Sequence, residues 1–299
     1  VTIPDSVISI GDYAFYNCGG LTNVTIPGSV TTIGEQPFSR CESLTSINVA
    51  NTNTFYSSVE GVLFDKNKTL LIQFPAGKSG HYTIPNSVQS IGFAAFYGCK
   101  NLAGIKVPKS NIKYSSEDGV LFDKNKTKLI QFPATKNGHY TIPNTVINIE
   151  YGAFYSTSLT SVTIPDSVTS IGAAAFYDSS SLTNVTIGES VKSVGNYAFS
   201  DCISLTSVTI PDSVVRIEIG TFERCTSLTS VTIPDSVTII GSFAFRGCSS
   251  LTSVTIPDSV DFISNGAFEG CTSLKIITFE GDAPATYYDN AFNGVSENA

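Results

Sequence analysis

The chain has 299 residues, of which 41% are hydrophobic and 14% charged, and its formal net charge is −8. This apolar content excludes a disordered chain, and no apolar run approaches the ~20 residues of a membrane-spanning helix. The acidic balance and the lack of interleaved aromatic and basic residues argue against nucleic acid as a partner. The chain begins inside a repeat and contains no Met, so we expect a processed or excised fragment.

A phrase of 23 residues recurs along almost the whole chain: L-x-x-V-x-I-P-D-S-V-x-x-I-G-x-x-A-F-x-x-C. Its cleanest copies are 205–225, 228–248 and 251–271. A period of this length predicts a solenoid, in which each coil buries its apolar residues against the next. We therefore expect one domain over residues 1–299, with about twelve coils.

Each copy predicts the path of one coil. In the copy that starts at Leu228, residues 231–233 alternate as a short strand with one buried face, and Pro234 ends that strand. Gly241 permits the next bend, and Phe245 follows in a short helical or 3₁₀ turn. Equivalent residues stack, which predicts a column of phenylalanines in the core: Phe15, Phe38, Phe96, Phe154, Phe176, Phe199, Phe222, Phe245, Phe268 and Phe292.

All seven cysteines take the same place in the repeat, nine residues before the proline position. One cysteine per coil predicts a column of free, buried thiols that act as small apolar fillers, rather than a disulfide framework. No Cys/His spacing indicates a metal site.

Two coils, 51–85 and 109–143, carry inserts of 12 residues. The inserts share the run Gly-Val-Leu-Phe-Asp-Lys-Asn-Lys-Thr at 61–69 and 119–127, which predicts a β-hairpin. We expect this hairpin on the side of the coil away from the concave strands. Residues 60–140 hold 11 Lys against five acids, a net charge of +6, which is typical of a surface that attracts an anionic ligand or of solvated loops.

The outward residues of the concave strands are mostly Thr and Ser, and the exceptions lie close to the inserts. Asn48, His81, Lys106 and His139 interrupt this ladder, with Lys109 and Lys113 beside it. Repeat proteins bind through their divergent coils, so these six residues are the candidate ligand-binding site. The alternative is that both histidines only pack locally in a duplicated module. A row of acidic residues after the strands favours turn formation over calcium binding.

The repeat, together with 276–284 near the end, resembles the BspA-like, Treponema-type leucine-rich repeat family. The resemblance implies a right-handed leucine-rich repeat solenoid of the α/β horseshoe type. Its parallel sheet would line the concave side, and residues 281–299 would form a C-terminal cap. It further implies a surface or secreted protein of anaerobic bacteria or parasitic protists, in a family whose characterised members are adhesins and host-interaction proteins.

We therefore predict a non-enzymatic, monomeric, extracellular protein with no catalytic residues, metal or cofactor, which binds a protein or a glycan through its concave face. A passive spacer that displays another domain is the alternative. A solenoid enzyme acting on polysaccharide ranks third, because no Ser/His/Asp, Cys/His or paired-carboxylate constellation stands outside the repeat register.

Overall fold

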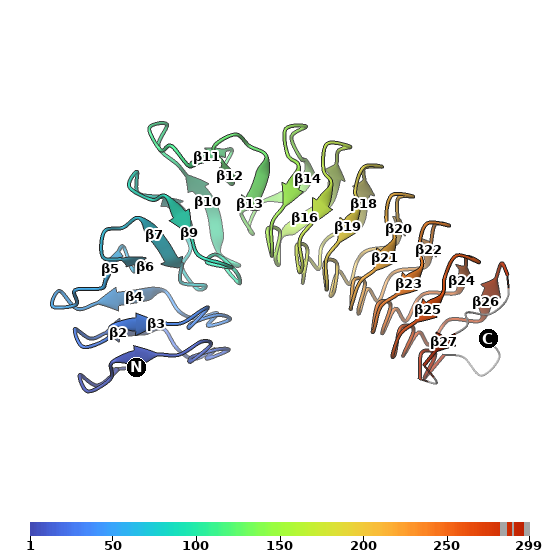
Figure 1. Cartoon of the computed structure of the whole chain (residues 1–299), viewed down its shortest axis with the longest axis horizontal. Helices are drawn as coiled ribbons and strands as arrows, with labels where there is room; N and C mark the ends of the chain where they lie inside the picture. Colours follow the sequence, from blue (N-terminus) through green and yellow to red (C-terminus); the bar gives the residue numbers. More distant parts are fainter. Residues whose placement is uncertain (282–285, 289, 296–299) are drawn as a thin grey trace. The chain divides into compact units, whose positions relative to one another are not determined.

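The computed structural model describes residues 1–281, 286–288 and 290–295, and these residues form short strands joined by turns (Figure 1). They include no helix, and therefore none that is long and apolar enough to cross a membrane. The chain divides into two compact units, which we describe separately. Unit 1 comprises Val1–Lys126 and Ile130–Thr135, and unit 2 comprises Thr127–Leu129 and Lys136–Ala299.

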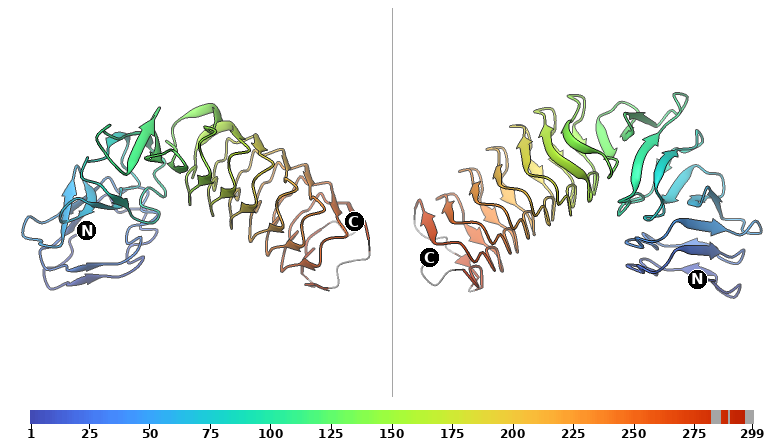
Figure 2. Two further views of the ribbon diagram at one scale, coloured as in Figure 1. Left: turned by 45° about the horizontal axis from the view of Figure 1, so that its top comes forward. Right: turned by 180° about the vertical axis from the view of Figure 1, so that it is seen from behind.

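Each coil of unit 2 contributes one strand to a first sheet and a shorter strand to a second sheet (Figures 1 and 2). The first-sheet strands are β14 (Asn137–Thr141), β16 (Ser158–Ile164), β18 (Asn184–Ile187), β20 (Ser207–Thr209) and β22 (Ser230–Thr232), which pair in this order, followed by the separate pair β24 (Ser253–Ile256) and β26 (Ile276–Phe279). The second-sheet strands are β13 (Lys128–Gln131), β15 (Asn148–Ile149), β17 (Ser170–Ile171) and β19 (Ser193–Val194), which pair in this order, followed by the separate series β21 (Arg216–Ile217), β23 (Ile239–Ile240), β25 (Phe262–Ile263) and β27 (Thr286–Tyr287). The pairs that the repeat predicts run parallel and in register.

Alternation decides which side chains the first sheet buries. In β18, Val185 and Ile187 are buried while Asn184 and Thr186 are exposed, because successive side chains of a strand point to opposite faces. Val185 pairs with Val162 of the preceding coil, so equal residues stack in columns. The parallel solenoid predicted from the repeat is confirmed.

Unit 1 repeats this plan with interruptions. Its first-sheet strands are β2 (Asn23–Ile26), β4 (Ser46–Val49), β8 (Gly80–Thr83) and β10 (Leu102–Lys106). Its short second-sheet strands are β1 (Ser9–Ile10), β3 (Thr32–Ile33) and β9 (Ser90–Ile91). The inserts supply β5 (Tyr56–Val59), β6 (Val62–Asp65), β7 (Leu70–Gln73), β11 (Tyr114–Glu117) and β12 (Val120–Asp123).

The segment around each phenylalanine is a run of turns, so the predicted helical or 3₁₀ turn is wrong. Around Phe176, Ala174 and Asp178 take left-handed φ values of 52° and 59°. The amides of Ala174, Phe176 and Asp178 donate to carbonyls of the next coil, while those of Ala175 and Tyr177 donate within their own coil. In a helix every amide would donate to a carbonyl four residues earlier in the same segment. Here every second amide donates to the next coil instead, so bonds between coils take the place of helical bonds.

The phenylalanines form the predicted column, and ring centroids of neighbours in unit 2 lie 4.6–5.5 Å apart. The inserted coils contribute two members that the sequence pattern did not predict. Phe74 lies 5.3 Å from Phe96, and Phe132 is the equivalent, buried residue of the second inserted coil. Each inserted coil thus also has a buried phenylalanine at this position.

The cysteines are free, and six of the seven are buried. Cys18 lies in the first coil and is exposed, which corrects the prediction that all seven are buried. The buried thiols are more than apolar fillers: the Cys225 thiol, for example, donates to Phe199 O at 3.1 Å. Ser179, which replaces a cysteine, makes the equivalent bond to Phe154 O at 2.7 Å. The column therefore links successive coils through side-chain donors.

The first insert forms a three-stranded antiparallel meander, so the predicted hairpin is present with one additional strand, β5. Its last strand, β7, pairs in parallel with β9 of the second sheet, on the side where we expected the hairpin. The turn between β5 and β6, however, lies against the first sheet, because the Ile47 amide of β4 donates to Gly61 O at 2.8 Å. The second insert does the same: the Ile105 amide donates to Gly119 O at 2.8 Å. The placement away from the concave strands is therefore wrong for the β5–β6 and β11–β12 turns.

The last coil is partly described. β27 pairs with β25, Ala291 is buried, and the Phe292 ring lies 5.3 Å from that of Phe268. Within the predicted cap 281–299, residues 282–285, 289 and 296–299 lie outside the described residues.

Candidate binding surface

The outer face of the first sheet in unit 2 is an array of small hydroxyl side chains. Thr186, Thr209, Thr232 and Thr255 are exposed at equivalent positions of successive coils. A second exposed column runs two residues before them: Asn184, Ser207, Ser230 and Ser253. This face corresponds to the strands that the sequence places on the concave side, and it carries no charge over these four coils.

His139 belongs to this hydroxyl face. Its Nδ1 lies 2.8 Å from Ser161 Oγ and its Nε2 lies 3.0 Å from Thr141 Oγ1, so both ring nitrogens have hydrogen-bond partners. The preceding Gly138 has a φ of 82°, and the pairing of β14 with β16 shifts by one residue at this point. These contacts favour the local-packing interpretation for His139.

His81 and Lys106 lie on paired strands of unit 1. In the register of β8 and β10, His81 faces Gly104 and Thr83 faces Lys106, so both side chains share the exposed face. A Cβ added to Gly104 would lie 2.8 Å from the His81 ring, so the imidazole covers the space that the glycine leaves open. Lys106 extends from the same face into solvent.

Asn48 lies on β4 and accepts a hydrogen bond from Ser46 Oγ at 3.0 Å. The β5–β6 turn lies against this strand, since a Cβ added to Gly61 would be 2.6 Å from Ser46 Oγ. Tyr82 of β8 is buried, and its burial raises the pKa of the phenol. The negative charge of Glu60, in the β5–β6 turn, raises this pKa further. The turn is thus close to both strands, and the structure does not pair β4 with β8.

Lys109 and Lys113 lie at the start of the second insert rather than on the strand face. The Lys124 Nζ donates to Lys109 O at 3.1 Å, and the Lys124 amide donates to Lys113 O at 2.8 Å. All three lysine side chains are exposed. The structure therefore groups Lys109 and Lys113 with Lys124, a lysine that the sequence prediction did not include.

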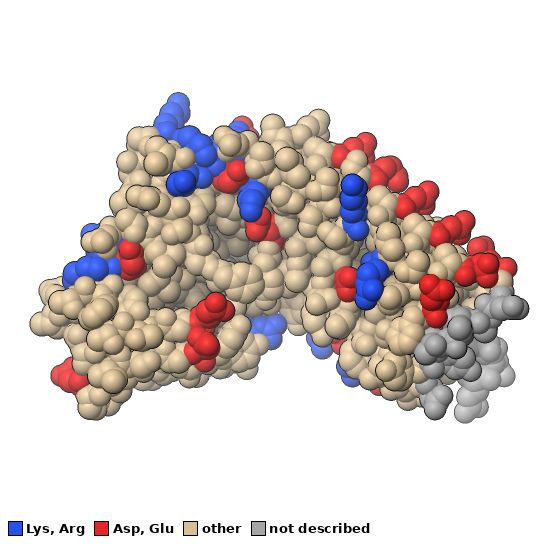
Figure 3. All heavy atoms as spheres, in the orientation of Figure 1, with Lys and Arg blue, Asp and Glu red and all other residues tan. Residues whose placement is uncertain are grey.

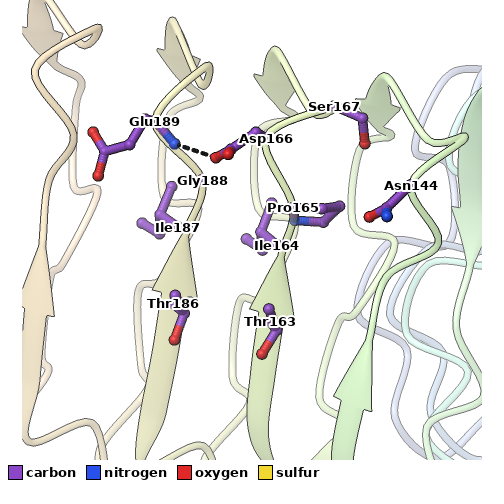
Figure 4. A pocket seen from close by; sticks show the side chains of 10 residues that line it. All are labelled: Asn144, Thr163, Ile164, Pro165, Asp166, Ser167, Thr186, Ile187, Gly188 and Glu189. Carbon is purple, nitrogen blue, oxygen red and sulfur yellow. Dashed lines mark hydrogen bonds between the residues drawn. The ribbon is translucent and has the colours of Figure 1, made fainter.

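A groove of about 520 Å³ lies on unit 2 at the coil where Gly188 replaces the usual proline (Figure 4). Ile164, Pro165 and Ile187 supply apolar side chains, and the Thr163 and Thr186 hydroxyls lie at the strand side. The glycine is needed here, because an added Cβ would lie 2.6 Å from the Pro165 backbone carbon. The missing proline was visible in the sequence, but periodicity gave no sign of a groove.

Two acidic residues, Asp166 and Glu189, border the groove on its other side. Asp166 Oδ1 accepts the Glu189 amide at 2.8 Å, which agrees with the predicted turn-forming role. The row continues in exposed Asp212, Asp235 and Asp258, and Figure 3 shows the carboxylates following one another along unit 2. Among the described residues, no three His, Cys, Asp or Glu side chains gather as a metal site.

The described geometry can be set beside known proteins. The model of the BspA type leucine-rich repeat region matches residues 1–77, 73–137, 131–230 and 215–298. A search of curated proteins found no significant match.

Solved structures of bacterial proteins share the fold. A leucine-rich repeat protein from Eubacterium ventriosum is 29% identical, with a TM-score of 0.53 over 97% of this chain and 68% of the other. A leucine-rich cell surface protein from Faecalibacterium prausnitzii is 25% identical, with a TM-score of 0.54 over 94% of this chain and 87% of the other. The pneumococcal vaccine antigen PcpA is 21% identical and shares the fold, with a TM-score of 0.64 over 93% of this chain and 78% of the other. Together with the family match over nearly every residue, the stacked columns identify this chain as a member of the BspA-type leucine-rich repeat family.

Proposed function

We propose that the chain is part of a cell-surface or secreted protein that binds a protein partner through the first-sheet face of unit 2. The family match and the similarity to a cell surface protein support the location. The exposed, uncharged hydroxyl face supports binding, because Ser and Thr side chains offer hydrogen bonds without the cost of removing water from charges. The proposed role is non-catalytic.

The groove at Gly188 carries this proposal, because it breaks the regular face next to the hydroxyl array. Its size is within the range of ligand pockets in proteins, about 300–1,000 Å³. An apolar floor beside two carboxylates suits a lysine or arginine side chain of the partner. The aliphatic stem would lie on half-buried Pro165, and the cation would approach Asp166 and Glu189.

The test uses purified chain on a biosensor against a panel of purified host extracellular proteins. For any protein bound, D166N/E189Q removes both charges at the groove and keeps the side-chain size. The matched control D235N/D258N removes two charges of the same acidic row outside the groove. We expect the groove variant to weaken binding about tenfold and the control to change it by less than about twofold. Equal losses in both variants would contradict an anchor at the groove.

A second pair of variants tests the face itself. Thr209→Arg places a bulky charge on the exposed first-sheet face, and Ser193→Arg places one on the exposed second sheet. The first should abolish binding and the second should not. A passive spacer predicts that no protein of the panel binds at all.

Of the sequence-predicted residues, His139 belongs to the proposed face, and His139→Ala tests the start of that face in unit 2. His81→Ala and Lys106→Ala test by themselves whether the paired strands β8 and β10 of unit 1 contact a partner. Because His139 is already bonded on both ring nitrogens, we expect its loss to matter least.

A further inference from the structure

The two inserts of unit 1 are near-duplicates that differ in charge where they begin. Both contain a buried asparagine, Asn53 or Asn111, and the residue two positions after it differs between the inserts. Asn51 and Phe55 of the first insert are replaced by Lys109 and Lys113 in the second. The second insert therefore has two additional positive charges on the same backbone frame.

The frame that holds these lysines is rigid. The Asn111 side chain is 1% exposed, and its Oδ1 accepts the amides of Lys113 and Tyr114, each at 2.9 Å. Its Nδ2 donates to Val88 O at 3.0 Å in the preceding coil. These bonds fix the turn between Lys109 and Lys113, so both lysines project from an ordered backbone.

Lys124, at the far end of β12, completes the group. Its Nζ donates to the carbonyls of Lys109 and Asn111, and its amide donates to Lys113 O. The three lysines thus extend from backbone positions joined by direct hydrogen bonds. Figure 3 shows Lys and Arg side chains gathered in the region of this hairpin. We name Lys109, Lys113 and Lys124 the lysine triad.

The triad is not neutralised by the carboxylates described around it. Lys126, two residues further on, pairs with Glu117 of the hairpin at 2.9 Å. Over the part of the chain that the structure describes, no ion pair involves a triad lysine. Three like charges on one turn repel one another, and an anion that contacts them relieves this repulsion within the Debye length of ~8 Å at physiological salt.

The chemistry of the triad favours one class of anion. Lysine offers point charges rather than the planar fork with which arginine binds phosphate on two sides. The triad also contains no aromatic ring on which a nucleic acid base would stack, whereas the first insert has exposed Phe55 at the equivalent position. We propose that the lysine triad binds a sulfated polysaccharide, whose repeated sulfate groups can contact all three ammonium groups at once.

The experiment measures binding of the whole chain to immobilised heparin at physiological salt. The variant K109N/K113F converts the second insert to the residues of the first, which the same backbone already accommodates. We expect roughly a 25-fold loss of affinity, about fivefold for each lysine, and an unchanged thermal unfolding midpoint. The reverse variant N51K/F55K should add a second site on the first insert and raise the binding capacity.

A charge-matched control distinguishes the triad from general attraction. K192N/K275N removes two exposed lysines of unit 2 and changes the net charge by the same amount. We expect it to leave heparin binding unchanged. An equal loss in this control, unchanged binding of K109N/K113F, or equally tight binding of desulfated heparin, polyphosphate or single-stranded DNA would overturn the proposal. The triad belongs to unit 1 and the face proposed to bind protein belongs to unit 2. K109N/K113F should therefore leave binding to a protein partner unaffected.

Discussion

Buried Asn53 gives the sharpest stability prediction in unit 1. Its side chain is 0% exposed and makes four hydrogen bonds to backbone groups. Nδ2 donates to Pro27 O at 2.8 Å and Val30 O at 2.9 Å, while Oδ1 accepts the amides of Phe55 and Tyr56 at 2.9 and 2.8 Å. The asparagine thus ties the start of the first insert to the coil before it.

Asn53→Ala would remove all four bonds, and of these groups Pro27 O would still accept the Val30 amide at 3.4 Å. A buried group that loses its partner costs about 1–3 kcal/mol, but the amide of exposed Phe55 can turn to water, so we expect a total of about 3–5 kcal/mol. The assay is urea unfolding combined with native-state hydrogen exchange, which separates local opening of unit 1 from unfolding elsewhere. Exposed Asn51→Ala is the control, with an expected change within about 0.5 kcal/mol. A loss below about 1 kcal/mol for Asn53→Ala, or uniform destabilisation of both units, would refute the reasoning.

Four further predictions concern the columns. At neutral pH without denaturant, iodoacetamide should modify only Cys18, and all seven cysteines should react after unfolding, as counted by mass spectrometry. Burial raises the pKa of the Cys225 thiol well above its usual value, so the neutral thiol is favoured in the folded state. The resulting stabilisation is present below the unfolded pKa near 9 and is lost as pH rises beyond it, which pH-dependent unfolding would detect. Cys225→Ser should cost less than Cys225→Val, because Ser179 already makes the equivalent bond in another coil; equal costs in urea unfolding would contradict a role as donor. Phe74→Ala should destabilise unit 1 by about 3–5 kcal/mol, since this side chain is fully buried in the column.

The regular coils could be predicted from the sequence because the same 23-residue pattern recurs in each of them. Its apolar residues mark the core and the strand, and its Pro, Asp, Ser and Gly residues mark the turns. Val185 and Ile187 alternate with polar residues, and this period of two is enough to assign the buried face. The turn around Phe176 was mispredicted for an equally physical reason. Ala-Ala-Ala-Phe is a good helical sequence locally, yet the segment forms hydrogen bonds to the next coil, with left-handed φ values at Ala174 and Asp178. Tertiary bonding between coils therefore overrides local propensity.

The inserts were harder to place because their contacts are long-range. The sequence indicates a hairpin around residues 66–69, but nothing in that run shows that Gly61 lies against β4 while β7 joins the second sheet. Phe74 was missed for the same reason, since it lies outside the 23-residue register and enters the column only after the insert. Of the candidate site, His81 and Lys106 do share one exposed face, whereas Lys109 and Lys113 join a lysine that the prediction omitted.

Residues that differ from the repeat consensus fall into two groups. Those whose polar atoms have partners within the protein are structural, whereas exposed charged residues without an ion-pair partner are candidates for ligand binding. His139 and Ser179 depart from their columns, yet their polar atoms have hydrogen-bond partners in the same strand or in a neighbouring coil. Lys109 and Lys113 depart from the first insert without gaining a carboxylate partner among the described residues, and their ordered backbone holds them exposed. Repulsion between these lysines lowers the stability of the folded chain, and no carboxylate among the described residues offsets it. Binding of an anionic ligand would explain why the lysines are there. The duplicated insert makes this argument testable inside one molecule, because its first copy shows how the same frame folds without the charges.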